Sequence, residues 1–242
     1  MKEKILYEAQ DTKRLLRAVP SSAIVMFCLS VVLMNLLANK EVSTGVGWFA
    51  LDCGFMLSWL SFLSMDVVTK RFGPKAAIKL SLFAVIVNLC VCAILKVVSM
   101  IPGNWGAFYT FGDSVVNSAL DSTIGGTWYV LFGSTVAIIV SSIVNSTINH
   151  TIGKRLKSNS FKAFALRSYV STFFGQFVDN MVFSLIVSYH FFGWSLVQCV
   201  SCSILGCLVE LLCEIVFSPL GFKISQKWEE ENVGAEYLGG AK

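Results

Sequence analysis

Charged residues are scarce in this sequence. Asp, Glu, Lys and Arg make up 14% of its 242 residues and 55% are hydrophobic, whereas soluble globular domains carry about 25% charged residues. Proline and glycine are also few, at 4 and 18 residues, which excludes a collagen-like repeat and a Pro/Gly-rich disordered chain. With a mean hydropathy of +0.69, the composition indicates a protein that lies in a lipid bilayer.

Long runs without charge predict where the chain crosses the bilayer. A helix needs about 20 mainly apolar residues to span the hydrocarbon core. Residues 18–39 and 122–149 contain no Asp, Glu, Lys or Arg, and residues 42–65 contain only Asp52. We therefore expect six transmembrane helices, at about residues 20–39, 46–66, 76–100, 127–150, 167–190 and 194–221.

The same runs favour helices over the strands of a transmembrane barrel. Barrel strands alternate apolar and polar residues over about ten positions, and stretches such as SSAIVMFCLSVVLMNLL do not alternate. Because lipid offers no hydrogen-bond partners, a spanning helix must pair its own backbone groups. The expected fold class is an all-α integral membrane protein, built as a six-helix bundle.

Basic residues predict the orientation of these helices. In a six-span topology, 17 of the 19 Lys and Arg residues fall on one side, in the two terminal segments and in the second and fourth loops. Loops rich in Lys and Arg stay in the cytoplasm, so both termini are expected there, in a multi-pass protein of the cell (inner) membrane. The predicted division is a cytoplasmic segment 1–19, a transmembrane domain 20–221 and a cytoplasmic tail 222–242.

Two other interpretations of the basic residues are disfavoured. A nucleic-acid partner would need the charge gathered with aromatic residues on one soluble face, and here the charge follows the topology. A cleaved signal peptide would have a short basic start and an apolar run of about 7–15 residues. This chain instead places a 17-residue charged stretch before a full-length span, so we expect the segment to be retained.

The eight cysteines all lie inside predicted spans, where cysteine behaves as a small apolar residue. Cys199 and Cys202 have a metal-like spacing, but neither His150 nor His190 completes a ligand set with them. P-loop, GxSxG, HExxH and EF-hand patterns are also missing. We expect no metal, no cofactor and no enzymatic activity, and a membrane enzyme or a scaffold with a polar core stays the alternative class.

The fifth predicted span carries polar residues on one face. Tyr169, Thr172, Gln176, Asp179 and Phe183 recur at steps of three and four, which places them on the same side of a helix. Ionisable and amide side chains at membrane depth usually face the bundle interior and mark a site. Asp179 is the leading candidate for a binding residue, and the alternative is a buried hydrogen bond or ion pair between helices.

Other spans contribute polar groups as well. Asn35 lies near the outer end of the first span, and Asn145 in the fourth would lie at a depth similar to that of Asp179. Glu210 and Glu214 share a face of the sixth span. These two acids either belong to the site, or anchor the helix at the membrane interface, or pair with Lys79 or Arg167.

Residues 101–126 contain no basic residue and four aromatics. Trp and Tyr gather at the headgroup level of membranes, so this segment is expected to form an aromatic interfacial belt with a short helix. The alternative is a lid over an outward-facing cavity.

Three strings resemble the queuosine-precursor transporter family, also called the vitamin uptake transporter (VUT) family. They are MNLLANK at 34–40, DVVTKRFG at 66–73 and RSYVSTFFGQFVDNMVF at 167–183. The resemblance covers roughly residues 20–220, and its most specific part is the Arg167…Gly-Gln-x-x-Asp179-x-x-x-Phe183 helix. Departures are Lys70 and Phe72, where the family usually has Glu and Tyr, and the lack of a Pro common in the second span.

The resemblance implies a six-helix protein similar to the S components of energy-coupling factor importers. It also implies uptake of a small planar purine-like base, a 7-deazaguanine such as preQ0, preQ1 or queuine. The pocket would be walled by the first, fourth and fifth spans. The substrate-binding residues are expected to be Asn35, Trp59, Asn145, Tyr169, Gln176, Asp179 and Phe183, and those of coupling or gating Asp66, Arg167 and Glu210.

The residue types fit such a ligand on independent grounds. A guanine-like edge offers two adjacent N–H donors to one carboxylate and a carbonyl to an amide N–H₂, while Phe183, Tyr169 or Trp59 could stack on the ring. The partners expected are this base and the bilayer, with an energy-coupling module or a second copy of the chain as further options. The alternative function is a binding-only S component that needs a separate ATPase.

Overall fold

The computed structural model describes residues 2–42, 45–49, 51–106, 114–126, 128–156 and 159–239. Within these ranges the chain is helical and forms no β-strand, apart from a single bridge between Glu41 and Asp52. The helices are α1 (Lys2–Ala18), α2 (Ser21–Leu37), α3 (Phe55–Phe72), α4 (Pro74–Ser99), α5 (Ser114–Gly125), α6 (Trp128–Leu156), α7 (Phe161–Phe183), the π-helical turn η2 (Ser184–Ser188), α8 (Leu196–Glu230) and α9 (Ala235–Gly239).

Four helical segments are long and apolar enough to cross a membrane: 74–99, 114–156, 161–188 and 196–230. A fifth exists if the end of α1 and α2, which meet at a bend of 110°, count as one span. Helix α3 is not among these candidate spans, because its 18 residues include three charged ones, Asp66, Lys70 and Arg71. The all-helical membrane fold is thus confirmed, whereas the count of six spans and the cytoplasmic termini stay predictions.

Local sequence signals explain where several helices begin and end. Gly73 ends α3 with a φ of 86°, a left-handed conformation that favours glycine, and Pro74 begins α4 at the position where proline costs no hydrogen bond. Ser195 caps α8 by accepting from the Gln198 backbone, while the Gln198 side chain accepts from Ser195 in return. These signals place α8 one to two residues from the predicted start of the sixth span.

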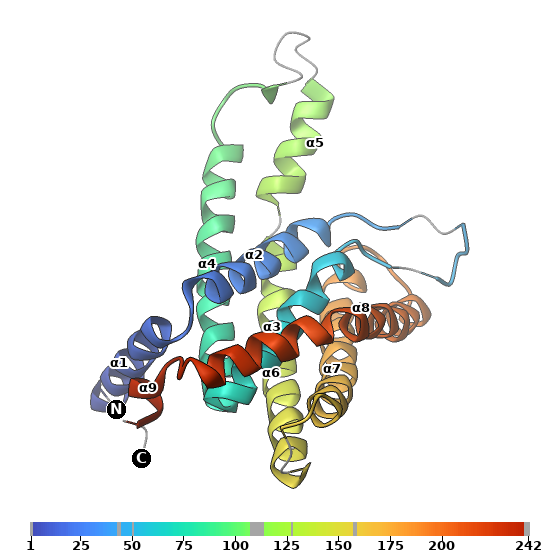
Figure 1. The fold of residues 1–242 in the computed structure, drawn as a ribbon. Coiled ribbons are helices and arrows are strands. Elements are labelled where there is room, and N and C mark those ends of the chain that lie inside the picture. The colour runs from blue at the N-terminus through green and yellow to red at the C-terminus, as the bar shows by residue number, and fades with distance from the viewer. Residues whose placement is uncertain are drawn as a thin grey trace.

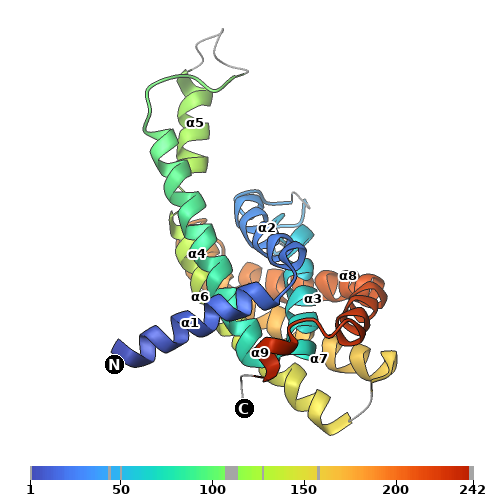
Figure 2. The ribbon, with the colours of Figure 1, turned by 60° about the vertical axis from the view of Figure 1, so that its left-hand side comes forward.

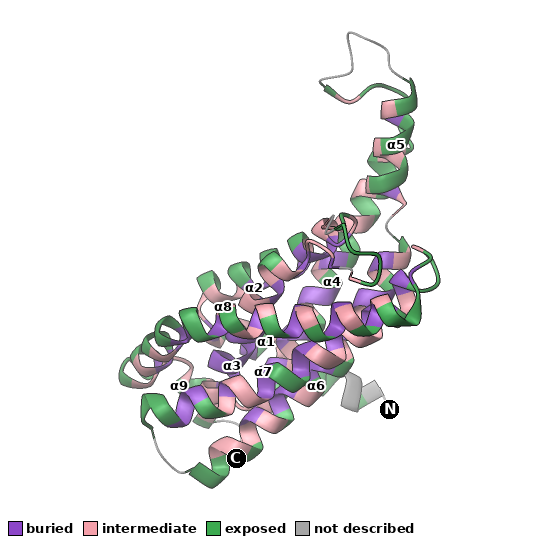
Figure 3. Ribbon diagram, turned by 90° about the vertical axis from the view of Figure 1, so that its right-hand side faces the viewer, coloured by how far each residue is buried: buried purple, intermediate pink, exposed green. Residues whose placement is uncertain are grey.

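The helices form one bundle, with α6 beside α7 and α4, and α8 packed on α3 and α7 (Figure 1). Its apolar core includes Phe27, Phe62, Met65, Leu80 and Phe164, from four helices. Buried positions face the bundle interior, and the outer faces stay exposed (Figure 3). Because those outer faces carry large apolar side chains, the surface suits a lipid environment.

Small residues allow α6 and α7 to approach closely. A Cβ atom added at Gly175 of α7 would lie 2.7 Å from the Phe62 ring and 2.9 Å from the Asn145 Cβ. One added at Gly133 of α6 would lie 2.2 Å from the Val187 side chain. Close backbone approach through small residues is the usual packing of helices in membranes.

The part of the expected aromatic belt or lid that the structure describes, residues 101–106 and 114–126, lies away from the rest of the bundle (Figure 1). Helix α5 packs along the second half of α4, and the two project beyond the other helices (Figures 1 and 2). Trp105 joins the start of this segment to α5, since its indole N–H donates to Asp121 at 3.0 Å and its backbone N–H to Asn117 at 2.6 Å. Residues 107–113, with three of the four aromatics, lie outside the described residues.

Candidate functional site

A small polar pocket lies where α2, α3, α6, α7 and α8 converge. Its volume is about 30 Å³, which is room for water molecules and far below the roughly 300–1,000 Å³ of ligand pockets. A ligand would therefore need the helices around it to separate. The lining residues are Met34, Asn35, Ala38, Asp52, Gly54, Phe55, Ser58, Ser134, Asp179, Asn180, Phe183 and Glu210.

Three carboxyl groups reach this pocket from different elements. Asp179 of α7 is 8% exposed and accepts a hydrogen bond from Ser141 of α6 at 2.6 Å. Glu210 of α8 accepts from Asn180 at 3.0 Å and from the hydroxyl of Ser58. Asp52, in the turn before α3, accepts from the backbone N–H of Gly54 at 2.7 Å.

The amide of Asn35 is the unsatisfied group of the pocket. Its Nδ2 is buried and has no hydrogen-bond partner, and the residue is 6% exposed. A buried donor left unpaired costs about 1–3 kcal/mol. The pocket thus holds a donor that a ligand carbonyl could satisfy, beside carboxylates that could accept from ligand N–H groups.

Two aromatic rings line the pocket, and a π-helical turn follows one of them in the chain. These rings belong to Phe55 and Phe183. Directly after Phe183 the chain enters η2, where the backbone N–H of Tyr189 donates to the Ser184 carbonyl five residues earlier, at 2.8 Å. Such π-turns inside α-helices often lie at functional sites, and the sequence carried no signal for this one.

The structure divides the predicted substrate-binding residues into three groups. Asn35, Asp179 and Phe183 come together at the pocket. Asn145 and Gln176 are fully buried outside the pocket, and Asn145 donates to Asp66 at 2.9 Å.

The other two predicted residues lie away from the pocket. Trp59 stacks on Phe217, with ring centroids 4.3 Å apart and an interplanar angle of 12°. Its indole N–H donates to the Met56 carbonyl. Tyr169 forms a hydrogen bond with Ser218 of α8 at 2.7 Å. Both rings therefore join α3 or α7 to α8.

The residues predicted for coupling or gating also separate. Glu210 belongs to the pocket, whereas Asp66 lies in a second buried polar cluster with Ser168 and Glu214. Arg167 adjoins that cluster, and its guanidinium lies 5.4 Å from the centre of the Phe164 ring. The alternative pairing of the α8 acids with Lys79 is not observed, because Lys79 bonds Glu8 at 2.7 Å and Asp11 of α1.

Four polar residues of the pocket were not predicted: Asp52, Ser58, Ser134 and Asn180. Asp52 did leave a signal, as the single charge in residues 42–65. Asn180 is adjacent to Asp179, but helical periodicity assigned it to another face. It lines the pocket because α7 and α8 are close there: a Cβ atom at Gly206 would lie 2.9 Å from the Asn180 Nδ2.

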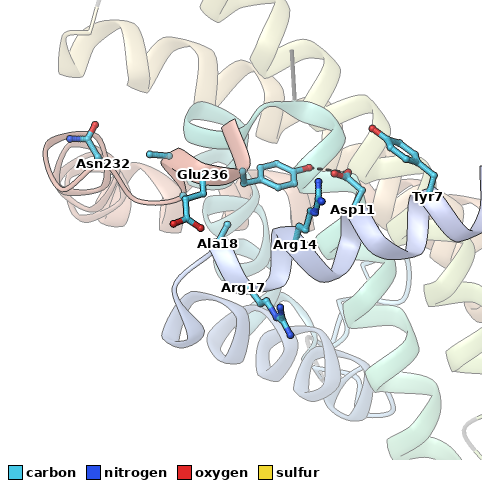
Figure 4. Close-up of a pocket in the computed structure, with 10 residues that line it drawn as sticks. Tyr7, Asp11, Arg14, Arg17, Ala18, Asn232 and Glu236 are labelled. Atoms are coloured by element: carbon cyan, nitrogen blue, oxygen red, sulfur yellow. Dashed lines mark hydrogen bonds between the residues drawn. The ribbon is translucent and has the colours of Figure 1, made fainter. Parts of the chain in front are cut away.

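A larger hollow of about 770 Å³ lies between the two terminal segments (Figure 4). Asp11 and Arg14 of α1 line it together with residues of α9, and the Tyr237 hydroxyl donates to Asp11 at 3.1 Å. Burial and the Asp11 carboxylate raise the pKa of Tyr237. This hollow contains no unpartnered buried polar group among the described residues, so the smaller intramembrane pocket is the better candidate.

Lys70, the departure from the usual family pattern, points into the protein. Its Nζ lies 3.4 Å from a Glu229 carboxylate oxygen and 3.0 Å from the Ser225 hydroxyl, both on α8. It also lies 5.0 Å from the centre of the Phe222 ring. Lys70 therefore connects α3 to α8.

Among the described residues, no group of three or more His, Cys, Asp or Glu side chains could hold a metal ion. Cys199 and Cys202 are free thiols, and the Cys199 thiol contacts the Ser184 carbonyl at 3.5 Å. The site chemistry rests on carboxyl, amide and hydroxyl groups.

Several membrane-length apolar helices indicate a multi-pass membrane protein, and a small polar pocket lies between them. The family model described as "Putative vitamin uptake transporter" matches residues 52–224, more than two thirds of the chain. The chain belongs to this family and is a membrane transporter of the vitamin-uptake type, which implies transport rather than catalysis. No curated protein and no solved structure matched it.

Proposed function

We propose that the protein imports a small planar purine-like base across the cell (inner) membrane, and that this base is a queuosine precursor of the 7-deazaguanine type. The observation that carries the proposal is that Asp179 and the unsatisfied Asn35 amide line the same pocket. Asp179 supplies an acceptor and Asn35 a donor. A deazaguanine edge carries the complementary groups.

The match is one of hydrogen-bond types. Two adjacent N–H donors of a guanine-like edge can be accepted by one carboxylate, here Asp179, and the neighbouring carbonyl can accept from Asn35. Hydrogen bonds to a charged group contribute about 1.5–3 kcal/mol. Phe55 and Phe183 provide aromatic surface for the flat ring, and stacking of a base contributes about 1–3 kcal/mol.

The carboxyl groups discriminate among the precursors. Asp52 and Glu210 line the pocket in addition to Asp179, and an apolar membrane interior leaves such acids poorly compensated. A ligand with a positive charge would stabilise them. Of the candidates, preQ1 carries a cationic aminomethyl group and preQ0 a neutral nitrile, so we expect preQ1 to bind more tightly.

Transport requires the pocket to widen and then to open on the other side. The π-turn η2 follows Phe183 directly, and a wide turn with a strained hydrogen-bond pattern is a place where a helix can bend. We propose that α7 and η2 move relative to α8 as the base enters. The opening of such a site to each side in turn is the usual mechanism of transporters.

Uptake into liposomes that contain only the purified protein tests the function. Tritiated preQ1 outside and unlabelled preQ1 inside should exchange, and unlabelled preQ0 or queuine outside should compete while adenine should not. Exchange by the protein alone would also exclude the alternative of a binding-only component that needs an ATPase. Binding of preQ1 without any exchange would favour that alternative, and the lack of both would contradict the proposed substrate.

A further inference from the structure

A second buried polar cluster lies about one to two helical turns from the pocket, along the same helices. Its centre is the hydroxyl of Ser168, which is within hydrogen-bond distance of Asp66 Oδ2 and of Glu214 Oε1. Asp66, Ser168 and Glu214 are each 0% exposed. They come from three different helices, α3, α7 and α8.

The hydrogen-bond geometry at Ser168 points to a proton in the cluster. A serine hydroxyl has one hydrogen to donate and lone pairs to accept with, so it can donate to only one of the two carboxyl groups. The other contact needs a hydrogen from the carboxyl side. Two buried carboxyl groups that share a site do not both ionise, which agrees with one proton on this pair.

Unpartnered atoms indicate that the cluster can change its state. Glu214 Oε2 and Asn145 Oδ1 are buried and have no hydrogen-bond partner, although the other atoms of both groups are bonded within the cluster. Both atoms are acceptors, and both would be satisfied by an added hydrogen. Gln176, also fully buried, has neither amide atom paired and lies between Thr172 and Asp179 on the same face of α7.

The charges around the cluster are also incompletely paired. Arg167 interacts electrostatically with Asp66, yet its Nε and Nη2 are buried without a hydrogen-bond partner. With one proton on the carboxyl pair, one negative charge faces this one positive charge. The titratable or charged side chains on the surrounding helices include Asp66 and Lys70 on α3, His150 on α6, Arg167, Tyr169 and Asp179 on α7, and Glu210, Glu214 and Glu229 on α8.

Lys70 does not neutralise the pair, because its Nζ is engaged by Glu229 and Ser225. Loss of the proton would therefore leave one excess negative charge in the bundle. Arg167, one residue before Ser168, has the free donors with which to respond.

From these observations we propose that Asp66, Ser168 and Glu214 form a proton-binding site, separate from the substrate pocket, and that movement of a proton through it drives uptake of the base. The coupling part rests on the proposed function. The same helices build both places: Glu214 lies one turn from Glu210, and Asn145 one turn from Ser141. Separation of these helices around a base would thus also change the contacts of the proton site.

Infrared spectroscopy tests the proton site without any substrate. The purified wild-type protein at neutral pH should show the carbonyl stretching band of a protonated carboxylic acid. The spectrum of Glu214→Gln should lack one such band. The matched control is Glu231→Gln, because Glu231 lies past the end of α8 with a side chain that is 55% exposed. An unchanged band in Glu214→Gln and in Asp66→Asn would overturn the proposal.

Proteoliposomes test the coupling. With an inward proton gradient, the wild type and Glu231→Gln should accumulate tritiated preQ1 above the outside concentration. Glu214→Gln, which keeps the shape of the protonated acid, should retain exchange and lose accumulation, and its exchange reports that it is folded. Accumulation that ignores the proton gradient, or that follows a sodium gradient instead, would contradict coupling. Lack of exchange by the wild type would contradict the proposed substrate and leave the infrared result to decide the proton site.

Discussion

Asn180 of α7 donates a hydrogen bond to Glu210 of α8 at 3.0 Å, and this contact holds one carboxyl group of the pocket in place. Gly206 permits it, since any side chain there would collide with the Asn180 amide. Asp179, the residue before Asn180, is held by Ser141 of the opposite neighbour, α6. Asp179 and Asn180 are consecutive residues of α7, yet they contact different helices, α6 and α8. Both residues line the pocket.

Replacement of Asp179 by Asn should abolish exchange of preQ1 while the protein still reaches the membrane. The amide would present an N–H₂ group to the N–H donors of the base and would remove a charge-assisted hydrogen bond. At about 1.5–3 kcal/mol, this loss corresponds to an affinity roughly 10 to 150 times lower. The matched control is Asp121→Asn on α5, where the Asn oxygen can still accept from Trp105. Exchange at the wild-type rate by Asp179→Asn would exclude the proposed role.

Asn35→Leu should weaken preQ1 binding without lowering stability. The Asn35 Nδ2 is buried and unpaired, so an apolar side chain of similar size removes an unsatisfied donor and leaves the apparent melting temperature in detergent equal or higher. Loss of one hydrogen bond to the base should reduce affinity by about 3- to 10-fold.

Asn39→Leu should give the opposite result. The Asn39 amide donates to the backbone carbonyls of Asn35 and Leu36 at 3.3 and 3.2 Å, so its loss should lower the melting temperature and leave binding unchanged. Equal effects of the two substitutions on preQ1 binding would show that Asn35 does not contact the ligand.

Gly175→Val should destabilise the contact between α6 and α7. A side chain at this position would press on Phe62 and Asn145, and overpacking of a tight core typically costs about 1–3 kcal/mol. Gly47→Ala serves as the control, since a Cβ atom there meets nothing within 4 Å. Thermal unfolding in detergent should separate the two variants. An unchanged midpoint for Gly175→Val would mean that the helices are not packed this closely.

Lys70→Glu should destabilise the protein by placing two acids together. Lys70 pairs with Glu229, whose side chain is 30% exposed, so the effect is screened by solvent and should be on the order of 1 kcal/mol. The double variant Lys70→Glu with Glu229→Lys restores an opposite pair and should recover most of the loss. The unfolding midpoints of the wild type, Lys70→Glu, Glu229→Lys and the double variant form a double-mutant cycle. Additive effects would show that Lys70 and Glu229 do not interact.

Much of the helical fold could be predicted from sequence, because the cost of placing charge in lipid acts on each residue locally. The run from Leu80 to Leu95 lies inside α4, and the predicted span 76–100 nearly matches Pro74–Ser99. The second predicted span was less accurate: 46–66 became α3, Phe55–Phe72. Helix α3 continues through Asp66 and Lys70 because partners on α7 and α8 satisfy them, and those partners lie more than 100 residues away in the chain.

Composition and uncharged runs were enough to predict a helical membrane protein with a few polar residues at membrane depth. Periodicity also placed Tyr169, Gln176 and Asp179 on one face of α7. The packing of the helices then brings Asp179 to one pocket with Asn35 and Glu210. The same packing joins Tyr169 to Ser218 and buries Gln176 outside the pocket. The physical reason is that helical spacing sets the direction of a side chain, but the crossing of helices sets what it meets.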